Sequence, residues 1–428
     1  MAIPDAIVLG IGCATMNIEI TLVILFAIAT GVAITARRFR IPYTAGLVLA
    51  GLLFGALHLV TPPHLTHELL FAVFLPGLIF EAAFNIDGGE VRKSWKTIGT
   101  LAIPGVVVAI LLTGLGTAAA MRGFGGGGFG IQDGLVFGAL VVATDPIAVV
   151  ALFQRLRVPK RLETLVEGES LLNDGTSIVL LSLLLDQVAG HGSSWEFLVF
   201  RFVMVTGGGA LVGGVFGALA WQLSSRIDDA MIEITITLLA AYGSFALAEQ
   251  LGCSGVIATV VTGVLCGRGA RGKAMSATTR TAVSTFWEYV AFALNSVIFL
   301  LIGFAVHLPA LAVVWAEIGV AYLIVLAARG AVVSMTATVF GRTRESLPVA
   351  WRTIIVWGGL RGALSMVLAL ALPETVPNRE LLTTMTFGVV LLSILLQGIS
   401  MPWLLTRLGI GDGSNRETTA LAGNPDAT

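Results

Sequence analysis

The segment IQDGLVFGALVVATDPIAVVALF, residues 131–153, carries the main information about the fold. It is long enough to cross a membrane as a helix, which needs about 20 mostly apolar residues. Near its middle it contains Asp145, followed directly by Pro146. Because proline has no amide hydrogen to continue the helical ladder, the pattern predicts a membrane helix that is interrupted beside a buried carboxylate.

The composition extends this interpretation to the whole chain. Of its 428 residues, 56% are hydrophobic and only 12% are charged, whereas soluble domains have about 25% charged residues. The formal net charge of -1 argues against a nucleic-acid partner, which would require clustered excess Lys and Arg. The sequence therefore predicts an all-α polytopic membrane protein.

Thirteen apolar runs, bounded by Gly, Pro and charged residues, are expected to cross the membrane. Lys and Arg beside membrane helices collect on the cytoplasmic side. With the N-terminus outside, the inner loops hold 20 of these residues and the outer loops hold only Arg122 and Arg379, which predicts an N-out, C-in topology. The expected spans are residues 19–36, 43–57, 69–86, 97–120, 131–153, 163–185, 196–222, 230–249, 252–267, 285–306, 310–338, 349–372 and 380–406.

Five charged residues are expected deep inside the membrane, away from the loops. Asp145, Asp174, Arg329 and Arg361 lie about ten positions from a span end, near the middle of a bilayer core about 30 Å thick, and Glu169 lies close to Asp174. An ionised side chain there costs about 2.5–3.5 kcal/mol on insertion scales. We expect the five residues to share one polar cavity; the alternative is that they form ion pairs that only lock helices together.

A second interruption is expected at Gly358-Gly359-Leu360-Arg361-Gly362, where glycines loosen the twelfth span. Interrupted helices expose carbonyl groups and helix ends, which transporters use together with carboxylates to coordinate small ions. Pro146, Gly358, Gly359 and Arg361 are therefore predicted to support the interrupted helices. A break at this position pairs with the one at Asp145 in the other half of the chain.

Oxygen ligands for a monovalent cation are available near the first interruption. Thr144, Asp145, Ser170 and Asp174 supply hydroxyls and carboxylates, and Ser170 and Asp174 are aligned by helical spacing of four. A nucleophilic or metal-hydrolase site would need a nearby His and a soluble pocket, and the sequence offers neither. We therefore expect a transporter rather than an enzyme, with no cofactor.

The count of buried charges suggests a mechanism. Three carboxylates against two arginines leave one negative charge that needs a proton or a cation. If Glu169 pairs with Arg329, and Arg361 offsets Asp145 or nearby helix ends, Asp174 is the exchangeable site. Proton and cation then compete for one carboxylate, which predicts electroneutral exchange of one for one.

The motifs Thr144–Pro146, Glu169–Asp174 and Gly358–Gly362 closely resemble those of the NhaP-type bacterial sodium/proton antiporters and the animal sodium/proton exchangers. The resemblance implies an NhaA-like antiporter fold with inverted repeats, two crossing interrupted helices and a homodimer of thirteen-helix protomers. It implies a membrane domain over residues 1–408, with a core at 97–185 and 310–406 and a dimerisation part at 19–86 and 196–306. The polar composition of residues 409–428 predicts a short disordered cytoplasmic tail.

The resemblance also implies roles for individual residues. Asp174 matches the essential carboxylate for cation and proton, and Asn173 matches its neighbour in the electroneutral branch, where electrogenic relatives have Asp. Asp145, Thr144 and Ser170 match positions near the ion. These assignments agree with the ligand set expected from the residues themselves.

Five further positions take their roles from the resemblance, and two of them form an ion pair. Glu169 and Arg329 match the core ion pair, and Arg361 matches the arginine of the second interrupted helix. Glu81 matches an acidic position on the third span, where a solvated side chain is the alternative. Glu249 matches an outer position associated with inhibitor binding.

We expect secondary active exchange of sodium, or lithium, for protons by alternating access, in the bacterial inner membrane. A potassium/proton antiporter of the same architecture is the nearer alternative, because oxygen ligands alone do not fix the ion. A cation channel is the more distant one.

Overall fold

A computed structural model describes residues 18–39, 42–57, 70–124, 128–190, 194–272, 275–343 and 345–410. Within these ranges the chain consists of helices and their connections, without a strand. Among the described residues, eight helices are long and apolar enough to cross a membrane by length and composition. The expected all-α polytopic architecture is confirmed at this level.

Each of the thirteen expected ranges contains helical residues. In chain order they are α1 (Ile18–Phe39), α2 (Tyr43–Ala56), the π-helical turn η1 (Leu70–Phe74), α4 (Leu75–Asn85), α5 (Gly88–Ala102), α6 (Pro104–Gly123), α7 (Ile131–Val142), α8 (Ile147–Leu156), α9 (Lys160–Val188), α10 (Trp195–Ser224), α11 (Ala230–Gln250), α12 (Gly255–Arg271), α13 (Ala277–Ala305), α14 (Leu308–Val313), α15 (Trp315–Val339), α16 (Val349–Trp357), α17 (Ala363–Leu370), α18 (Arg379–Leu392), the π-helical turn η2 (Ser393–Gly398) and α19 (Ile399–Arg407).

Two predicted helix starts were wrong. The span expected from residue 97 is preceded by α5, which begins at Gly88, and the span expected from 285 begins at Ala277 as α13. In both cases a side chain caps the true start: Asp87 accepts from the amides of Gly89 and Glu90, and Ser276 accepts from the amide of Thr279. The charged residues at these helix starts lie in α5 and α13 and not in the expected loops.

Both expected interruptions are present, and they cross each other. The chain is non-helical between α7 and α8 and again between α16 and α17. The Asp145 amide donates a hydrogen bond of 2.7 Å to the Leu360 carbonyl, so the two unwound segments are in direct contact. This crossing joins parts of the chain that are more than two hundred residues apart.

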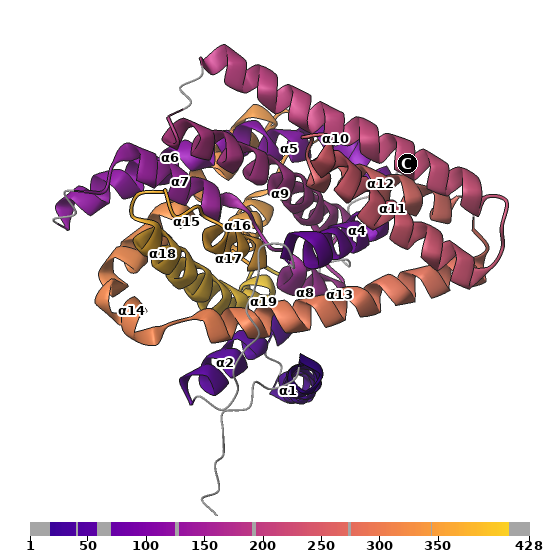
Figure 1. The fold of residues 1–428 in the computed structure, drawn as a ribbon, viewed down its shortest axis with the longest axis horizontal. Coiled ribbons are helices and arrows are strands. Elements are labelled where there is room, and N and C mark those ends of the chain that lie inside the picture. Colours follow the sequence, from indigo (N-terminus) through magenta and orange to yellow (C-terminus); the bar gives the residue numbers. More distant parts are fainter. Residues whose placement is uncertain are drawn as a thin grey trace, which may run out of the picture.

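The long helices surround this crossing. In Figure 1, α10 runs along one edge of the molecule and α13 along another, with α1 and α2 outside α13 and α9 passing through the interior. α10 packs on α12, and α13 packs on α2 and α4. Gly51 and Gly303 permit close contact of α2 with α13, since a Cβ added at Gly51 would lie 2.9 Å from the Gly303 Cα.

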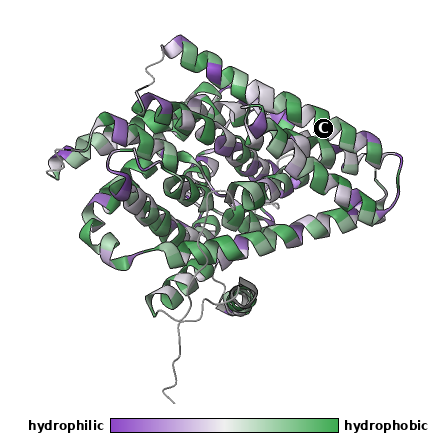
Figure 2. Cartoon of the chain, in the orientation of Figure 1, coloured by the Kyte–Doolittle hydropathy of each residue, from purple (hydrophilic) through white to green (hydrophobic). Residues whose placement is uncertain are grey.

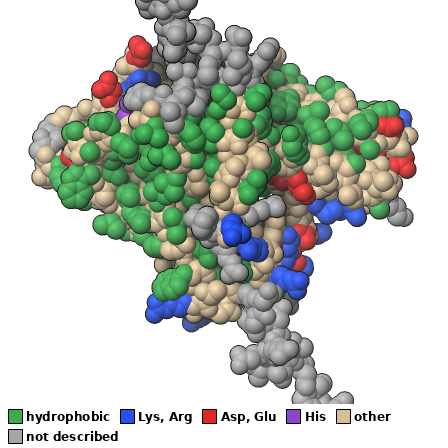
Figure 3. Space-filling view, turned by 90° about the horizontal axis from the view of Figure 1, so that it is seen from below, with side chains coloured by type: hydrophobic (Ala, Val, Ile, Leu, Met, Phe, Trp, Pro, Cys, Tyr) green, Lys and Arg blue, Asp and Glu red, His purple; other side chains and the backbone are tan. Residues whose placement is uncertain are grey.

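The outer surface is mostly apolar. Figure 2 shows hydrophobic residues along most of α10 and α13. α10 exposes large hydrophobic side chains along its length, including Trp195, Phe200, Leu211 and Leu219. Figure 3 shows a broad hydrophobic band, with most of the Lys and Arg side chains in view gathered below it. Such a surface is typical of a protein surrounded by lipid.

Candidate functional site

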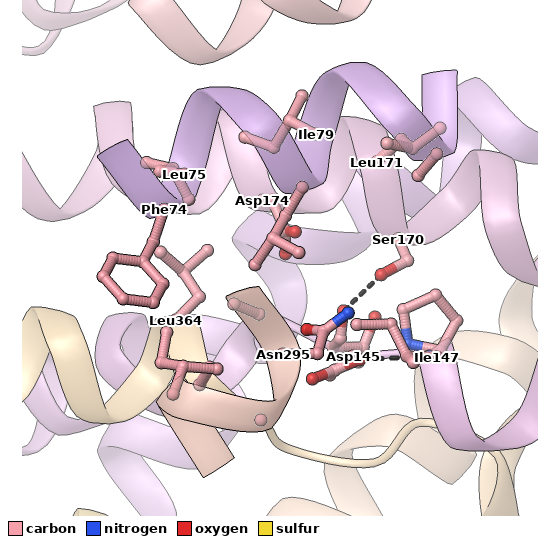
Figure 4. A pocket seen from close by; sticks show the side chains of 18 of the residues that line it. Phe74, Leu75, Ile79, Asp145, Ile147, Ser170, Leu171, Asp174, Asn295 and Leu364 are labelled. Carbon is pink, nitrogen blue, oxygen red and sulfur yellow. Dashed lines mark hydrogen bonds between the residues drawn. The ribbon is translucent and has the colours of Figure 1, made fainter. Parts of the chain in front are cut away.

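A cavity of about 110 Å³ lies beside the crossing. Its walls come from α4, the α7–α8 break, α9, α13 and the start of α17, and it is large enough for several water molecules. Figure 4 shows Asp145 and Asp174 reaching this pocket from different elements. The two carboxylates expected at the middle of the membrane thus share one cavity.

Asp174 lies on α9 with its side chain partly exposed to the cavity. In the described ranges its carboxylate has neither a hydrogen-bond nor an ion-pair partner, and only its backbone carbonyl accepts a bond, from Ser177. A buried carboxylate without a protein donor requires a proton, a cation or water. This is the environment expected of an exchangeable site.

Asp145 is held by the ends of two helices. Its carboxylate accepts a hydrogen bond of 3.0 Å from the amide of Ile147, the first residue of α8, and the amide of Ala363 at the start of α17 also bonds to it. Helix N-termini stabilise negative charge. A Cβ added at Gly362 would collide with the Asp145 side chain, so this glycine allows the close approach. Pro146 directly precedes α8 and leaves the preceding residues unwound.

Thr144 and Ser170 lie beside these carboxylates and line the same cavity. The Ser170 hydroxyl donates to the Thr144 carbonyl, which fixes α9 against the unwound segment. The Ser170 oxygen keeps lone pairs for a cation. The four expected ligands, Thr144, Asp145, Ser170 and Asp174, are therefore brought together.

Asn173 lies on the neighbouring stripe of α9, in line with Glu169, as the helical spacing of four predicts. It is buried and does not line the cavity. Its amide nitrogen lies within hydrogen-bond distance of the Val142 carbonyl (3.1 Å), the Thr144 hydroxyl (3.3 Å) and the Glu169 carboxylate (3.3 Å). Asn173 thus braces the end of α7 and joins it to the neighbouring ion pair.

Glu169 and Arg329 form a buried bidentate ion pair, as the resemblance implied. The two guanidinium nitrogens donate to the two carboxylate oxygens at 2.7 and 2.8 Å, and one nitrogen also donates to the Ile355 carbonyl at 3.3 Å. The pair links α9 with α15 and α16. A Cβ added at Gly359 would lie 2.8 Å from Arg329 Nε, so Gly359 leaves space for the guanidinium.

Arg361 neutralises a helix end. Its guanidinium donates to the carbonyls of Val142 and Ala143, where α7 ends, and its amide donates to the Ser393 hydroxyl at 2.9 Å. It has no ion pair with Asp145 within the described part of the chain. Of the two roles considered for Arg361, the structure therefore shows compensation of the negative end of the α7 dipole. Near it, a Cβ added at Gly358 would crowd Met401.

Glu81 and Glu249, the two remaining candidates, differ in position, since only Glu81 lines the cavity. Glu81 lines the cavity from α4 and accepts a hydrogen bond of 2.7 Å from the Asn85 side chain. Glu249 lies at the end of α11 and does not line the cavity. It accepts a hydrogen bond of 2.8 Å from the amide of Gly255, where α12 begins.

Two further polar residues line the cavity but were missed from the sequence: Glu167 and Asn295. Glu167 precedes Asp174 by two helical turns on the same face of α9, a spacing that could have identified it. Asn295 is a single amide inside an apolar run of α13, which was a weaker signal. Among the described residues lining the cavity, four are acidic and none is Lys or Arg, so the cavity attracts cations.

Comparisons with known proteins agree on one family. The profile of the family described as "Sodium/hydrogen exchanger, transmembrane" matches residues 22–407. The chain is 37% identical to the Na(+)/H(+) antiporter ApNhaP of Aphanothece halophytica, over 94% of this chain and 77% of that protein. It is 35% identical to the Na(+)/H(+) antiporter NhaG of Bacillus atrophaeus, over 90% and 74% respectively.

A solved structure shares the fold. The sodium proton antiporter MjNhaP1 from Methanocaldococcus jannaschii superposes with a TM-score of 0.74 at 19% identity, covering 91% of this chain and 97% of the other. The motifs around Asp145, Asp174 and Arg361, the crossing of their helices and the match along nearly the whole chain agree with one another. The chain belongs to the transmembrane sodium/hydrogen exchanger family.

Proposed function

We propose that this protein exchanges one Na+ (or Li+) for one H+ across the membrane, with Asp174 as the exchange site. The observation that carries the proposal is the Asp174 carboxylate, which faces a cavity without basic residues and has no partner among the described residues. It binds either a proton or a cation, because one of them is enough to neutralise the single negative charge of a buried carboxylate. The transported ions are substrates, and no cofactor takes part.

Thr144, Asp145 and Ser170 complete the oxygen set around the ion. Asp145 stays fixed because backbone amides hold it, whereas Asp174 is free to change its occupant. The Glu169–Arg329 pair and Arg361 compensate the remaining buried charges. One-for-one exchange further requires that Glu81 and Glu167 keep the same protonation throughout the cycle.

Alternating access is supported by the place of the cavity between two sets of helices. One wall comes from α9, the α7–α8 break and α17, which belong to the proposed core, residues 97–185 and 310–406. The opposite wall comes from α4 and α13, which belong to the proposed dimerisation part, residues 19–86 and 196–306. Movement of one set against the other would expose Asp174 to each side in turn.

We further propose thirteen spans with inverted repeats, arranged as in the sodium proton antiporter MjNhaP1 rather than in the expected NhaA-like way, N-out and C-in, in a bacterial inner membrane. The collection of Lys and Arg on one side of the apolar band supports the orientation. A homodimer is part of the proposal because the resemblance to the antiporter family implies one. Glu81 and Glu167 lie on the basic-loop side of Asp174, so the cavity extends toward the cytoplasm.

The test is ion-driven proton movement in proteoliposomes with a pH-sensitive dye. Addition of Na+ should release trapped protons, with Li+ also active and K+ much weaker. A K+ response equal to or above the Na+ response would instead identify a potassium/proton antiporter. Transport currents that scale with turnover would contradict electroneutrality, and conduction that survives Asp174→Asn would indicate a channel.

A further inference from the structure

Asn295 is a buried polar side chain that the exchange scheme above does not use. It lies on α13 with 7% of its surface exposed, and it lines the same cavity as Asp145 and Asp174 (Figure 4). Its side-chain oxygen is buried and makes no hydrogen bond, and no other residue in the described ranges bonds to the amide. A buried amide without a partner is unusual in a folded protein.

Contacts of the neighbouring residues fix the position of Asn295, so the unpartnered amide does not lie in a loosely packed segment. The hydroxyl of the next residue, Ser296, lies 2.6 Å from the Tyr43 hydroxyl of α2 and donates to the Phe292 carbonyl. Tyr43 also stacks on Phe292 with ring centroids 5.4 Å apart. α13 is therefore tied to α2 at the height of the cavity, and Asn295 faces it from a fixed wall.

The Asn295 side-chain oxygen is enclosed in the structure, and a half turn of the amide about its Cβ–Cγ bond would bring it to the cavity surface, where it suits an alkali cation. Hard cations are coordinated by carbonyl, hydroxyl and carboxylate oxygens, which replace their water shell. Thr144, Ser170 and Asp174 come from the α7–α8 break and α9, whereas α13 forms the other wall of the cavity. A ligand from α13 would make the ion contact both walls.

We propose that Asn295 is a further cation ligand, supplied from α13 to the partly dehydrated alkali ion held at Asp174. This inference rests on the proposed function. It explains why a polar group is kept without a protein partner at a cost in stability: the missing partner is the ion. Because the ion then bridges two walls, its binding favours their approach.

The test compares Asn295→Leu with the wild type by Na+-driven exchange and by the shift of Tm on adding Na+. Leu has nearly the same size but no oxygen. We expect the KM for Na+ to rise about five- to tenfold, as for the loss of one neutral polar contact. Tm without Na+ should stay equal or increase, because an unpartnered polar group has been removed. The Na+-dependent part of the Tm shift should decrease.

Two controls separate ligation from packing. Asn295→Asp keeps an oxygen at the same place and should bring the KM back toward the wild-type value. Thr117→Val removes another buried, unpartnered oxygen, on α6 and outside the cavity, and should leave the KM unchanged. If Asn295→Leu does not fold, Asn295→Ala gives the same comparison.

An active Asn295→Leu protein with wild-type KM and wild-type Na+-dependent Tm shift would overturn the inference. Equal increases of KM in Asn295→Leu and Thr117→Val would overturn it as well. Failure of the proposed function is distinguishable, because the wild-type protein itself would then show no Na+-driven proton movement.

Discussion

Glu169 and Asp174 lie on the same helix, five residues apart, yet their surroundings are opposite. Glu169 is bonded through both oxygens to Arg329 and is closed off from the cavity. Asp174 faces the cavity and has no partner in the described part of the chain. In the proposed mechanism, the face of α9 on which a carboxylate falls decides whether it holds the fold together or exchanges its proton. Burial alone does not distinguish a structural charge from a functional one.

The largest expected effect is that of Asp174→Asn. The amide cannot release a proton, so exchange should fall at least about 100-fold, as expected when an essential proton-transferring group is lost. Folding should be preserved, because no protein contact of the carboxylate is broken. Na+-driven proton release in proteoliposomes measures the first effect, and the Tm of the purified protein measures the second. Residual exchange near the wild-type rate would show that another residue is the exchange site. The contrast between Asp174 and Glu169 would then not hold.

Glu169→Gln should show the reverse pattern, with a larger loss of stability than of ion affinity. Breaking one partner of a buried ion pair leaves Arg329 uncompensated and typically costs about 3–5 kcal/mol. Tm should therefore decrease strongly, while the KM for Na+ in the folded fraction changes little. Replacing both partners by Met should recover most of the lost Tm, since a well-packed apolar pair often matches a buried ion pair. A Tm equal to that of the wild type in Glu169→Gln would show that the pair is not structural.

The parts of this contrast that could be predicted from the sequence are those that depend on neighbouring residues along the chain. Asp145 and Asp174 stood out because a charge in the middle of an apolar run is costly, and Pro146 and the glycines around Arg361 identified the two breaks. These signals require no knowledge of the packing. The charge count only assumes the Glu169–Arg329 pair and the family resemblance implies it, because no pattern along the chain relates two residues 160 positions apart.

The remaining features depend on packing or on capping. Asn295 and Glu167 become notable only when their helices form the wall of a cavity that also holds Asp174. Helical spacing of four predicts that Asn173 lies in line with Glu169, but its contact with the Val142 carbonyl at the end of α7 depends on packing. The early starts of α5 and α13 came from caps at Asp87 and Ser276, which outweighed the charged residues that follow.

Gly362→Ala tests whether Asp145 belongs with the functional carboxylate or the structural one. The added Cβ would collide with the Asp145 side chain and push it from the amide of Ile147. We expect the KM for Na+ to rise about tenfold, since a ligand displaced by about 1 Å is poorly placed. Gly330→Ala on α15 is the matched control, because its Cβ would meet no atom within 4 Å. A similar KM in both variants would assign Asp145 a structural role only.

Glu249→Gln should have the smallest effect, because Glu249 is a carboxylate outside the cavity whose visible task is to accept a hydrogen bond from Gly255. The Gln side chain keeps an oxygen acceptor, so Tm and exchange should both stay near the wild-type values. Glu249→Ala removes the acceptor and should cost about 1 kcal/mol, the usual value for a lost cap or hydrogen bond, again without a change in KM. A raised KM in Glu249→Gln would show that a negative charge at this helix end matters for the ion. Access to the cavity alone would then not separate the carboxylates that affect ion binding from those that do not.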